Sequence, residues 1–194
     1  VFLACKTGER SAAGAARELE QSLQRLRTDH FDLYQLHSVT TPQDVEQILG
    51  PGGAMETFVR AREEGKTRYL GFSAHSEEAA LALMERFDFD TVLLPINWAA
   101  WTKGNFGPRV VQRATEKGMG ILALKALARR LLDEGEQRQW PKCWYQPVTS
   151  YAEAARGIRF PLSQGVPSAL TTGHEPLFRW ACDAAEALTP LTAE

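Results

Sequence analysis

Residues 67–84, TRYLGFSAHSEEAALALM, hold the pattern that decides the fold class. Residues 67–72 form a short apolar run typical of a buried strand, and residues 76–84 follow as a helix opened by a capping serine. A strand that leads directly into a helix is the repeating unit of parallel sheets. The stretch therefore predicts a parallel sheet that is covered by helices.

The same unit recurs along the chain. Strands are expected at residues 1–5, 31–36, 67–72, 91–95, 120–124 and 167–170, and helices at residues 11–26, 55–64, 76–84, 108–117, 151–162 and 176–188. A doubly wound sheet and a TIM-type (β/α)8 barrel both give this alternation, but the barrel typically needs about 250 residues and eight units. Six units in a chain of 194 residues predict one α/β domain over residues 1–194.

Composition excludes several classes of protein. Hydrophobic residues make up 44% of the chain and charged residues 24%, and the net charge is −2. This balance predicts a soluble protein that binds no nucleic acid, and no apolar run approaches the roughly 18 to 20 residues of a membrane span. Cys5, Cys143 and Cys182 are widely spaced, which fits a reducing cytoplasm and indicates neither a disulfide framework nor a structural metal site.

Polar residues gather where the predicted strands end, which is where parallel α/β folds carry their catalytic groups. These positions hold Lys6, His37, Ser73, His75, Asn97, Lys125 and the turn at residues 171–174. A lysine that extends into water and a structural histidine are alternatives for Lys6 and His37. However, Gln35 and His37 share one strand face, and polar groups on a buried strand need a partner such as a neighbouring lysine or a carbonyl substrate.

A small polar turn precedes the last predicted helix. Residues 171–179 read TTGHEPLFR, so the free N–H groups of Thr172, Gly173 and His174, together with the helix dipole, would suit a phosphate group. Arg179, one turn into the helix, would add positive charge. The alternative is an ordinary helix start followed by an exposed arginine.

Residues 38–54 and 129–150 are interpreted as the two longest non-helical stretches, and long ordered loops are usually functional. Aromatic residues gather in the second of these loops and after the fourth strand. They are Trp98, Trp101, Trp140, Trp144 and Tyr145. They would line a pocket for an apolar substrate or form a small core that holds a long loop.

The segments ACKTGER, DHFDLYQLHS, GKTRYLGFSAHS and KGMGILALKAL, followed by the final turn, resemble the aldo-keto reductase family in order and over nearly the whole chain. The resemblance implies an eight-stranded barrel that binds NADPH, with NADH as the alternative, and reduces small carbonyl compounds. In this resemblance, Lys6 matches the family's lysine, which lowers the pKa of a catalytic tyrosine. His37 matches the family's histidine, which orients the substrate carbonyl.

The family's lysine ends its third strand, so the chain is expected to begin two units late and to form an incomplete barrel. The family's catalytic aspartate and acid tyrosine belong to those earlier units. Tyr34 faces away from His37 and Tyr69 lies inside its strand, so neither replaces the tyrosine. The chain alone is therefore expected to be a poor reductase.

Positions that would hold the nicotinamide differ from the family pattern. Ser73 is retained, but Ala74, Leu93 and Leu124 stand where the family often has asparagine, glutamine and an aromatic residue. Asn97 and Lys125 are the candidates to bind the cofactor in their place, together with Thr172, Gly173, His174 and Arg179 of the final turn and helix.

Two other functions stay open. A barrel hydrolase would use His37, His75 and His174 to bind a metal ion, although that leaves Lys6 and the polar turn without a role. A non-catalytic remnant would bind a partner or associate through its open sheet edges. The sequence sets no oligomeric state.

Overall fold

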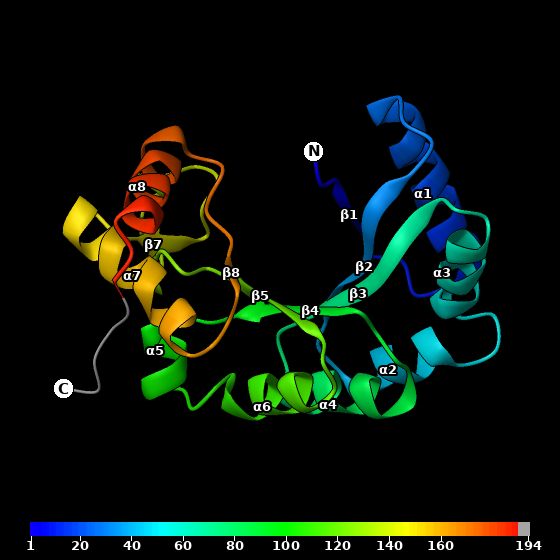
Figure 1. Ribbon diagram of the computed structural model, residues 1–194. Coiled ribbons are helices and arrows are strands. Elements are labelled where there is room, and N and C mark those ends of the chain that lie inside the picture. The colour runs from blue at the N-terminus through cyan, green and yellow to red at the C-terminus, as the bar shows by residue number, and fades with distance from the viewer. Residues whose placement is uncertain (190–194) are drawn as a thin grey trace. The chain divides into compact units, whose positions relative to one another are not determined.

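The computed structural model describes residues 1–189 and divides into two compact units (Figure 1). The first unit comprises Val1–Leu93 and Gln112–Gly120, and the second comprises Leu94–Val111 and the chain from Ile121 onward. The expectation of one domain over residues 1–194 stays a prediction.

The first unit is a layer of parallel strands with helices packed against it. Its elements are β1 (Ala4–Thr7), α1 (Ala12–Leu26), β2 (Phe31–Val39), α2 (Pro42–Leu49), α3 (Ala54–Glu63), β3 (Thr67–Ala74), α4 (Glu77–Arg86) and most of β4 (Thr91–Pro95) and α6 (Pro108–Glu116). The strands pair in chain order, β1 with β2, β2 with β3 and β3 with β4, all parallel. The predicted parallel α/β layer is therefore confirmed.

One row of residues crosses all four of these strands. Lys6 pairs with Gln35, Gln35 with Gly71, and Gly71 with Thr91. Gly71 is required here because a Cβ atom at this position would lie 2.1 Å from Oγ1 of Thr91 and 3.0 Å from its carbonyl oxygen. The open space lets Nε2 of Gln35 donate to Oγ1 of Thr91 at 3.4 Å, which gives a buried amide a partner.

Aromatic side chains join the strands to the helices. The ring of Tyr34 lies 6.2 Å from that of Phe31 and 4.7 Å from that of Phe58 in α3, measured between centroids. Its hydroxyl donates to the carbonyl of Ala15 in α1 at 3.5 Å. Tyr34 thus faces α1 and α3, which agrees with the predicted orientation away from His37. Both helices lie beside β2 and β3 in Figure 1.

The interpretation of residues 38–54 as non-helical is wrong, because α2 lies within them. The Thr41 side chain accepts from the Asp44 N–H at 3.1 Å, and the Asp44 carboxylate accepts from the Thr41 N–H at 3.0 Å. This capping box, with Pro42 in the first turn, starts a short helix whose apolar residues Val45 and Ile48 are buried. The prediction missed it because only two apolar side chains mark the buried face.

The second unit contains α5 (Trp98–Thr102), β5 (Gly120–Leu124), β6 (Ala128–Leu131), β7 (Tyr145–Pro147), α7 (Tyr151–Ser163), β8 (Ser168–Ala169) and α8 (Glu175–Glu186). β5 pairs in parallel with β8, whereas β6 and β7 form an antiparallel pair. Residues 129–150, predicted to be an irregular loop, therefore fold partly as a two-stranded ribbon. The sequence pattern did not predict β6, because Arg129 and Arg130 interrupt the apolar run that marks a buried strand.

Helices α7 and α8 pack together on a small core (Figure 1). The core consists of Ala126, Leu127, Val148, Ala154, Ile158, Leu177, Ala181 and Ala184. α7 approaches the segment after β5 so closely that a Cβ atom on Gly157 would lie 2.7 Å from the carbonyl oxygen of Ala126. Among the described residues, no helix is long and apolar enough to cross a membrane.

Candidate functional site

Lys6 and His37 lie on neighbouring strands of the first unit. Lys6 is inside β1 rather than just after it, because β1 spans Ala4–Thr7 and not residues 1–5 as predicted. Partial burial lowers the pKa of Lys6. Partial burial also lowers the pKa of His37, and the positive charges of Lys6 and Arg10 lower it further. His37 is therefore a neutral imidazole at pH 7, beside a cation that raises the cost of protonating it.

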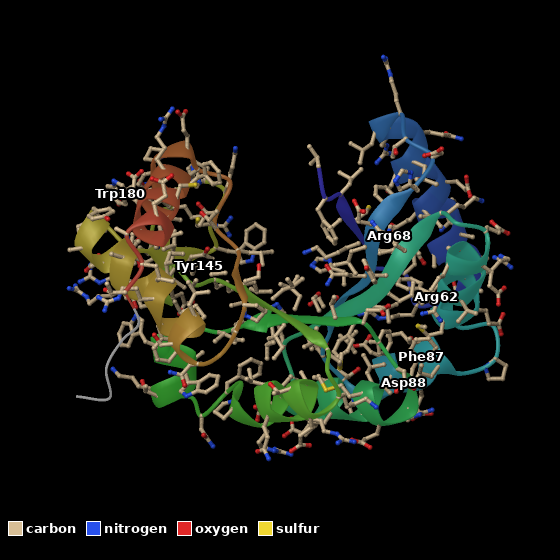
Figure 2. All side chains as sticks on the ribbon, viewed as in Figure 1. Arg62, Arg68, Phe87, Asp88, Tyr145 and Trp180 are labelled. Carbon is tan, nitrogen blue, oxygen red and sulfur yellow. The ribbon has the colours of Figure 1, made fainter. Side chains whose placement is uncertain are left out.

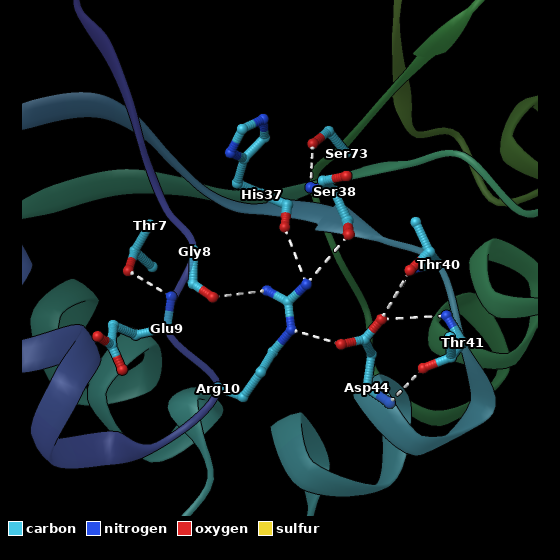
Figure 3. Close-up of polar contacts among 10 residues, drawn as sticks. All are labelled: Thr7, Gly8, Glu9, Arg10, His37, Ser38, Thr40, Thr41, Asp44 and Ser73. Carbon is cyan, nitrogen blue, oxygen red and sulfur yellow. Dashed lines mark hydrogen bonds and ion pairs between the residues drawn. The ribbon is translucent and has the colours of Figure 1, made fainter.

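Arg10 holds the backbone that carries His37 (Figure 3). Its guanidinium donates to the carbonyl oxygens of His37 at 3.0 Å and Ser38 at 3.1 Å, and to that of Gly8 at 3.3 Å. Its Nε donates to Oδ1 of Asp44 at 2.9 Å. One side chain thus fixes the end of β2 relative to the segment after β1.

Asp44 completes this network (Figure 3). Its carboxylate also accepts from the backbone N–H groups of Thr40 at 2.9 Å and Thr41 at 3.0 Å. Burial raises the pKa of Asp44, but these N–H groups and the Arg10 guanidinium together lower it well below its usual range. The sequence analysis missed Arg10 and Asp44, although the Thr-x-x-Asp capping pattern at residues 41–44 was a signal for the second.

Ser73 is committed to the backbone of the neighbouring strand. Its Oγ accepts from the N–H of Ser38 at 2.7 Å, where Ser38 has a left-handed φ of 54°. The register of β2 and β3 shifts between Leu36 and Val39, so this bond closes an irregular strand end. The Ser73 hydroxyl can still donate one hydrogen bond to a ligand.

Asn97 and Lys125 line one cavity of about 400 Å³ in the second unit. The other lining residues are Pro95, Ala99, Ala100, Ala128, Arg129, Arg130, Leu131, Trp144 and Tyr145. Burial lowers the pKa of Lys125, which adopts a left-handed φ of 61°. The Asn97 side chain caps α5, since its Oδ1 accepts from the Ala100 N–H at 2.9 Å.

The same cavity contains Tyr145 and Trp144, which were predicted to line a pocket or form a small core, and Arg130, which the sequence analysis did not assign. Tyr145 (Figure 2) stays protonated because burial, and then the neighbouring Cys143, raise its pKa. Arg130 is held by two bonds to Glu136, at 2.7 and 2.9 Å. The Trp144 side chain is 67% exposed, so this ring belongs to the cavity rim rather than to a core. Positive charge and aromatic rings thus surround Lys125.

The polar turn before α8 brings Thr172, Gly173 and His174 together with Lys142. Oγ1 of Thr172 accepts from the His174 N–H at 3.2 Å. Nε2 of His174 accepts from the Lys142 N–H at 3.1 Å, and Nζ of Lys142 donates to the Gly173 carbonyl at 2.9 Å. Lys142, which the sequence analysis did not assign, thus places an ammonium group at this turn.

Two further side chains define the turn. Oγ1 of Thr171 is buried and makes no hydrogen bond within residues 1–189. Arg179 pairs with Glu175 at 2.8 Å, with both side chains 72% exposed, so the pair is weak and water competes for it. This weak pair leaves Arg179 available to a ligand, but the exposed position also means that water screens its charge.

The predicted residues thus fall into separate groups. Lys6, His37 and Ser73 belong to the first unit, and Asn97, Lys125 and the turn before α8 belong to the second. Within residues 1–189, no three His, Cys, Asp or Glu side chains form a group that could hold a metal ion. The metal-dependent hydrolase therefore lacks a ligand set in the described part of the chain.

Parallel strands that alternate with helices, and polar groups near the ends of those strands, define a protein of the parallel α/β class. The aldo/keto reductase family model matches residues 1–191. The chain belongs to the aldo/keto reductase family.

Curated relatives match over part of the chain. A probable aldo-keto reductase of Glycine max is 29% identical over 110 residues, which cover 57% of this chain and 29% of the relative. An uncharacterized oxidoreductase of Bacillus subtilis, YrpG, is 32% identical over 119 residues, or 60% of this chain and 35% of the relative. The matched stretches thus span about a third of these relatives.

Solved structures agree with the fold. A putative aldo-keto reductase of Pseudomonas aeruginosa superposes with a TM-score of 0.69 at 23% identity, over 96% of this chain and 63% of that one. A Bombyx mori aldo-keto reductase, solved in complex with NADP, gives 0.68 at 16% identity over 99% and 64%. The chain therefore matches about two thirds of the length of these TIM-barrel proteins. This confirms the prediction of an incomplete barrel.

Proposed function

We propose that this chain carries the cofactor-binding and carbonyl-orienting residues of an oxidoreductase that reduces small carbonyl compounds with NADPH. A bound reduced nicotinamide would supply the hydride that adds to the carbonyl carbon. The family membership and the NADP bound to the Bombyx mori relative support this class of reaction.

The turn before α8 is the observation that carries the proposal. The start of α8 has no side-chain cap from His174, so the N–H groups of Glu175 and Leu177 remain for a ligand. The N–H of His174 already donates to Thr172, and Pro176 has no N–H. The buried hydroxyl of Thr171, which makes no hydrogen bond within residues 1–189, and the ammonium of Lys142 lie at the same turn. N–H donors, a hydroxyl and a cation fit a phosphate group.

The cavity around Lys125 suits the remainder of such a cofactor. Its volume of about 400 Å³ is within the usual range for ligand sites, roughly 300 to 1,000 Å³. Lys125, Arg129 and Arg130 supply positive charge, and Trp144 supplies an aromatic surface for a planar ring. These groups offer an alternative to the family positions now occupied by Ala74, Leu93 and Leu124.

In the first unit, Lys6 and His37 would act on the substrate. A neutral His37 can donate one hydrogen bond to a carbonyl oxygen, and the adjacent Lys6 favours negative charge there. The two tyrosines of this unit do not serve as the acid, because Tyr34 bonds to α1 and Tyr69 lies midway along β3. We therefore expect slow turnover from the 194-residue chain alone.

Titration of the purified chain with NADPH tests the proposal, with quenching of tryptophan fluorescence as the readout. Trp140 reports on the turn, since its ring lies 5.1 Å from that of His174. We expect saturable binding that weakens about tenfold in Lys142→Ala, because each charge-assisted phosphate contact contributes roughly 1.5 kcal/mol or more. Arg179→Ala should weaken binding less, because Arg179 is exposed and water screens its charge.

Arg25→Ala is the matched control, because Arg25 is an exposed arginine in the last turn of α1. Its affinity for NADPH should equal that of the wild type. A parallel titration with NADH measures the preference for the phosphorylated cofactor. Absence of saturable binding by a protein with a normal circular dichroism spectrum would refute the assignment of the turn and the cavity.

A further inference from the structure

A second cavity of the second unit, of about 280 Å³, lies outside the proposed cofactor site. Its lining residues are Trp98, Arg129, Val148, Glu153, Arg156, Gly157 and Phe160. Arg129 also lines the cavity around Lys125, and no other residue is shared. The volume is slightly below the usual range of roughly 300 to 1,000 Å³ for ligand sites, which indicates a small ligand.

The walls of this cavity are aromatic. Trp98, in the first turn of α5, is 41% exposed and therefore presents much of its ring to a ligand. Phe160 of α7 is fixed by an edge-to-face contact with Trp101, at 6.0 Å between ring centroids. Gly157 of the same helix contributes its backbone to the lining. A flat apolar group would recover the contacts that an exposed tryptophan lacks.

The charges of the cavity favour an anion. Glu153 is already satisfied, because its Oε2 accepts from the Thr149 N–H at 2.7 Å and from the Thr149 hydroxyl at 3.2 Å. Its Oε1 lies 3.8 Å from Nε of Arg129. The Thr149 N–H most strongly lowers the pKa of Glu153, and the positive charges of Arg129 and Arg156 contribute.

Arg156 is the charged residue of the lining whose guanidinium is available to a ligand. It lines the cavity on the same helix as Phe160, and within the described residues its guanidinium makes no hydrogen bond or ion pair. With Arg129 and Glu153, it gives the lining a net charge of +1. A cation held by Glu153 and the aromatic rings would have to displace the Thr149 bonds and approach two guanidinium groups, so an anion is favoured.

We propose that this cavity binds a small aromatic carboxylate, with the carboxylate on Arg156 and Arg129 and the ring between Trp98 and Phe160. Guanidinium groups bind carboxylates through paired hydrogen bonds, and an aromatic ring fits the apolar walls. The site shares Arg129 with the proposed cofactor cavity, and its other lining residues belong to it alone.

Isothermal titration calorimetry with cinnamate tests this proposal on the full chain. Saturable binding is expected, with at least tenfold weaker affinity in Arg156→Ala and in Trp98→Ala. Cinnamamide, which has the same ring and no charge, should also bind at least tenfold more weakly. Equal affinity for cinnamate and cinnamamide, or no saturable binding of cinnamate to the wild-type chain, would overturn the proposal.

Arg138→Ala is the matched control, since Arg138 is an exposed arginine of the second unit that lines neither cavity. It should bind cinnamate like the wild type, and all variants should keep the wild-type circular dichroism spectrum. Wild-type affinity in Arg156→Ala would contradict the proposal. Displacement of cinnamate by NADPH together with wild-type cinnamate affinity in Trp98→Ala would also contradict it, because that combination would place the acid in the cofactor cavity.

Discussion

Arg10 and Asp44, 34 residues apart in sequence, form an ion pair with Nε and Oδ1 separated by 2.9 Å. Their side chains are 18% and 19% exposed, so neither is freely solvated. The pair joins the segment after β1 to the start of α2, and Arg10 also bonds to the carbonyls of His37 and Ser38. The position of His37 therefore depends on a residue outside its own strand.

Asp44→Asn should lower the free energy of unfolding by about 2 kcal/mol, since hydrogen bonds to a charged group contribute roughly 1.5 to 3 kcal/mol. The amide would keep the shape of the side chain but lose its charge and part of its accepting capacity. Urea denaturation followed by circular dichroism measures the change. Glu46→Gln is the control, because Glu46 pairs with Arg86 but is 69% exposed, and it should cause no measurable change.

The effect of Asp44 should also depend on pH. Its folded-state pKa lies below the unfolded value of about 3.9, so the stabilisation is complete above that value. It is lost as the pH falls through the lower folded-state pKa. The stability difference between the wild type and Asp44→Asn should therefore be constant from pH 8 to about pH 5 and shrink below about pH 4. A difference that does not change between pH 5 and pH 3 would contradict this account.

Lys6→Met should raise the pKa of His37. Partial burial lowers this pKa most, and the charge of Lys6 is the next cause, so removing the lysine restores only part of the shift. The wild-type imidazole should titrate below the usual value of about 6.5, and the variant closer to it. NMR titration of the imidazole resonances measures both values. Lys66→Met, which removes a lysine that pairs with Glu20 and Glu64, should leave the His37 pKa unchanged.

The sequence predicted the parallel strands because apolar runs of four to six residues, bounded by turns, mark buried strands. It placed the polar residues near the carboxyl ends of the strands, but Lys6, His37 and Ser73 lie inside β1, β2 and β3 rather than after them. Strand boundaries depend on the hydrogen bonds of the partner strand, here the pairing of Lys6 with Gln35, and local pattern does not contain that information.

The contacts around the site could not be predicted for a related reason. Arg10 reaches Asp44, and Lys142 reaches the turn at Gly173, across 34 and 31 residues of sequence. Such pairs follow from how loops fold over strand ends, whereas periodicity reports only neighbours within an element. Ser73 shows the converse, because its position was predicted but its bond to the Ser38 N–H was not.

Two glycines inside helices should respond oppositely to substitution by alanine. On helix propensity alone, alanine is favoured by about 1 kcal/mol at either position. A Cβ atom on Gly157 would lie 2.7 Å from the backbone carbonyl oxygen of Ala126. This contact is with backbone, so α7 and the segment of Ala126 would have to move apart to relieve it. Gly157→Ala should therefore lower stability by roughly 1 to 3 kcal/mol in thermal or urea denaturation.

Gly14→Ala is the matched comparison. Its Cβ atom would meet Oε2 of Glu9 at 2.1 Å, but this is the end of a flexible, partly exposed side chain that can turn away. The variant should be as stable as the wild type or more stable. Stabilisation by Gly157→Ala as well would show that α7 can move away from Ala126.

His174→Ala should loosen the segment between β6 and β7. The imidazole accepts the Lys142 N–H at 3.1 Å and contacts the ring of Trp140, so it ties this segment to the turn before α8. Without the imidazole, the exposed bond after Arg138 should be cut faster by trypsin under native conditions, because proteolysis follows local opening. Mass spectrometry of a limited digest measures the rate.

A second tryptic site provides the internal reference for this digest. Cleavage after Arg25, in the last turn of α1, should proceed at the same rate in His174→Ala and the wild type. His174→Gln keeps an acceptor near the Lys142 N–H and should fall between them. Equal cleavage after Arg138 in all three proteins would mean that the side chain of Lys142, through its bond to Gly173 at 2.9 Å, suffices to hold the segment.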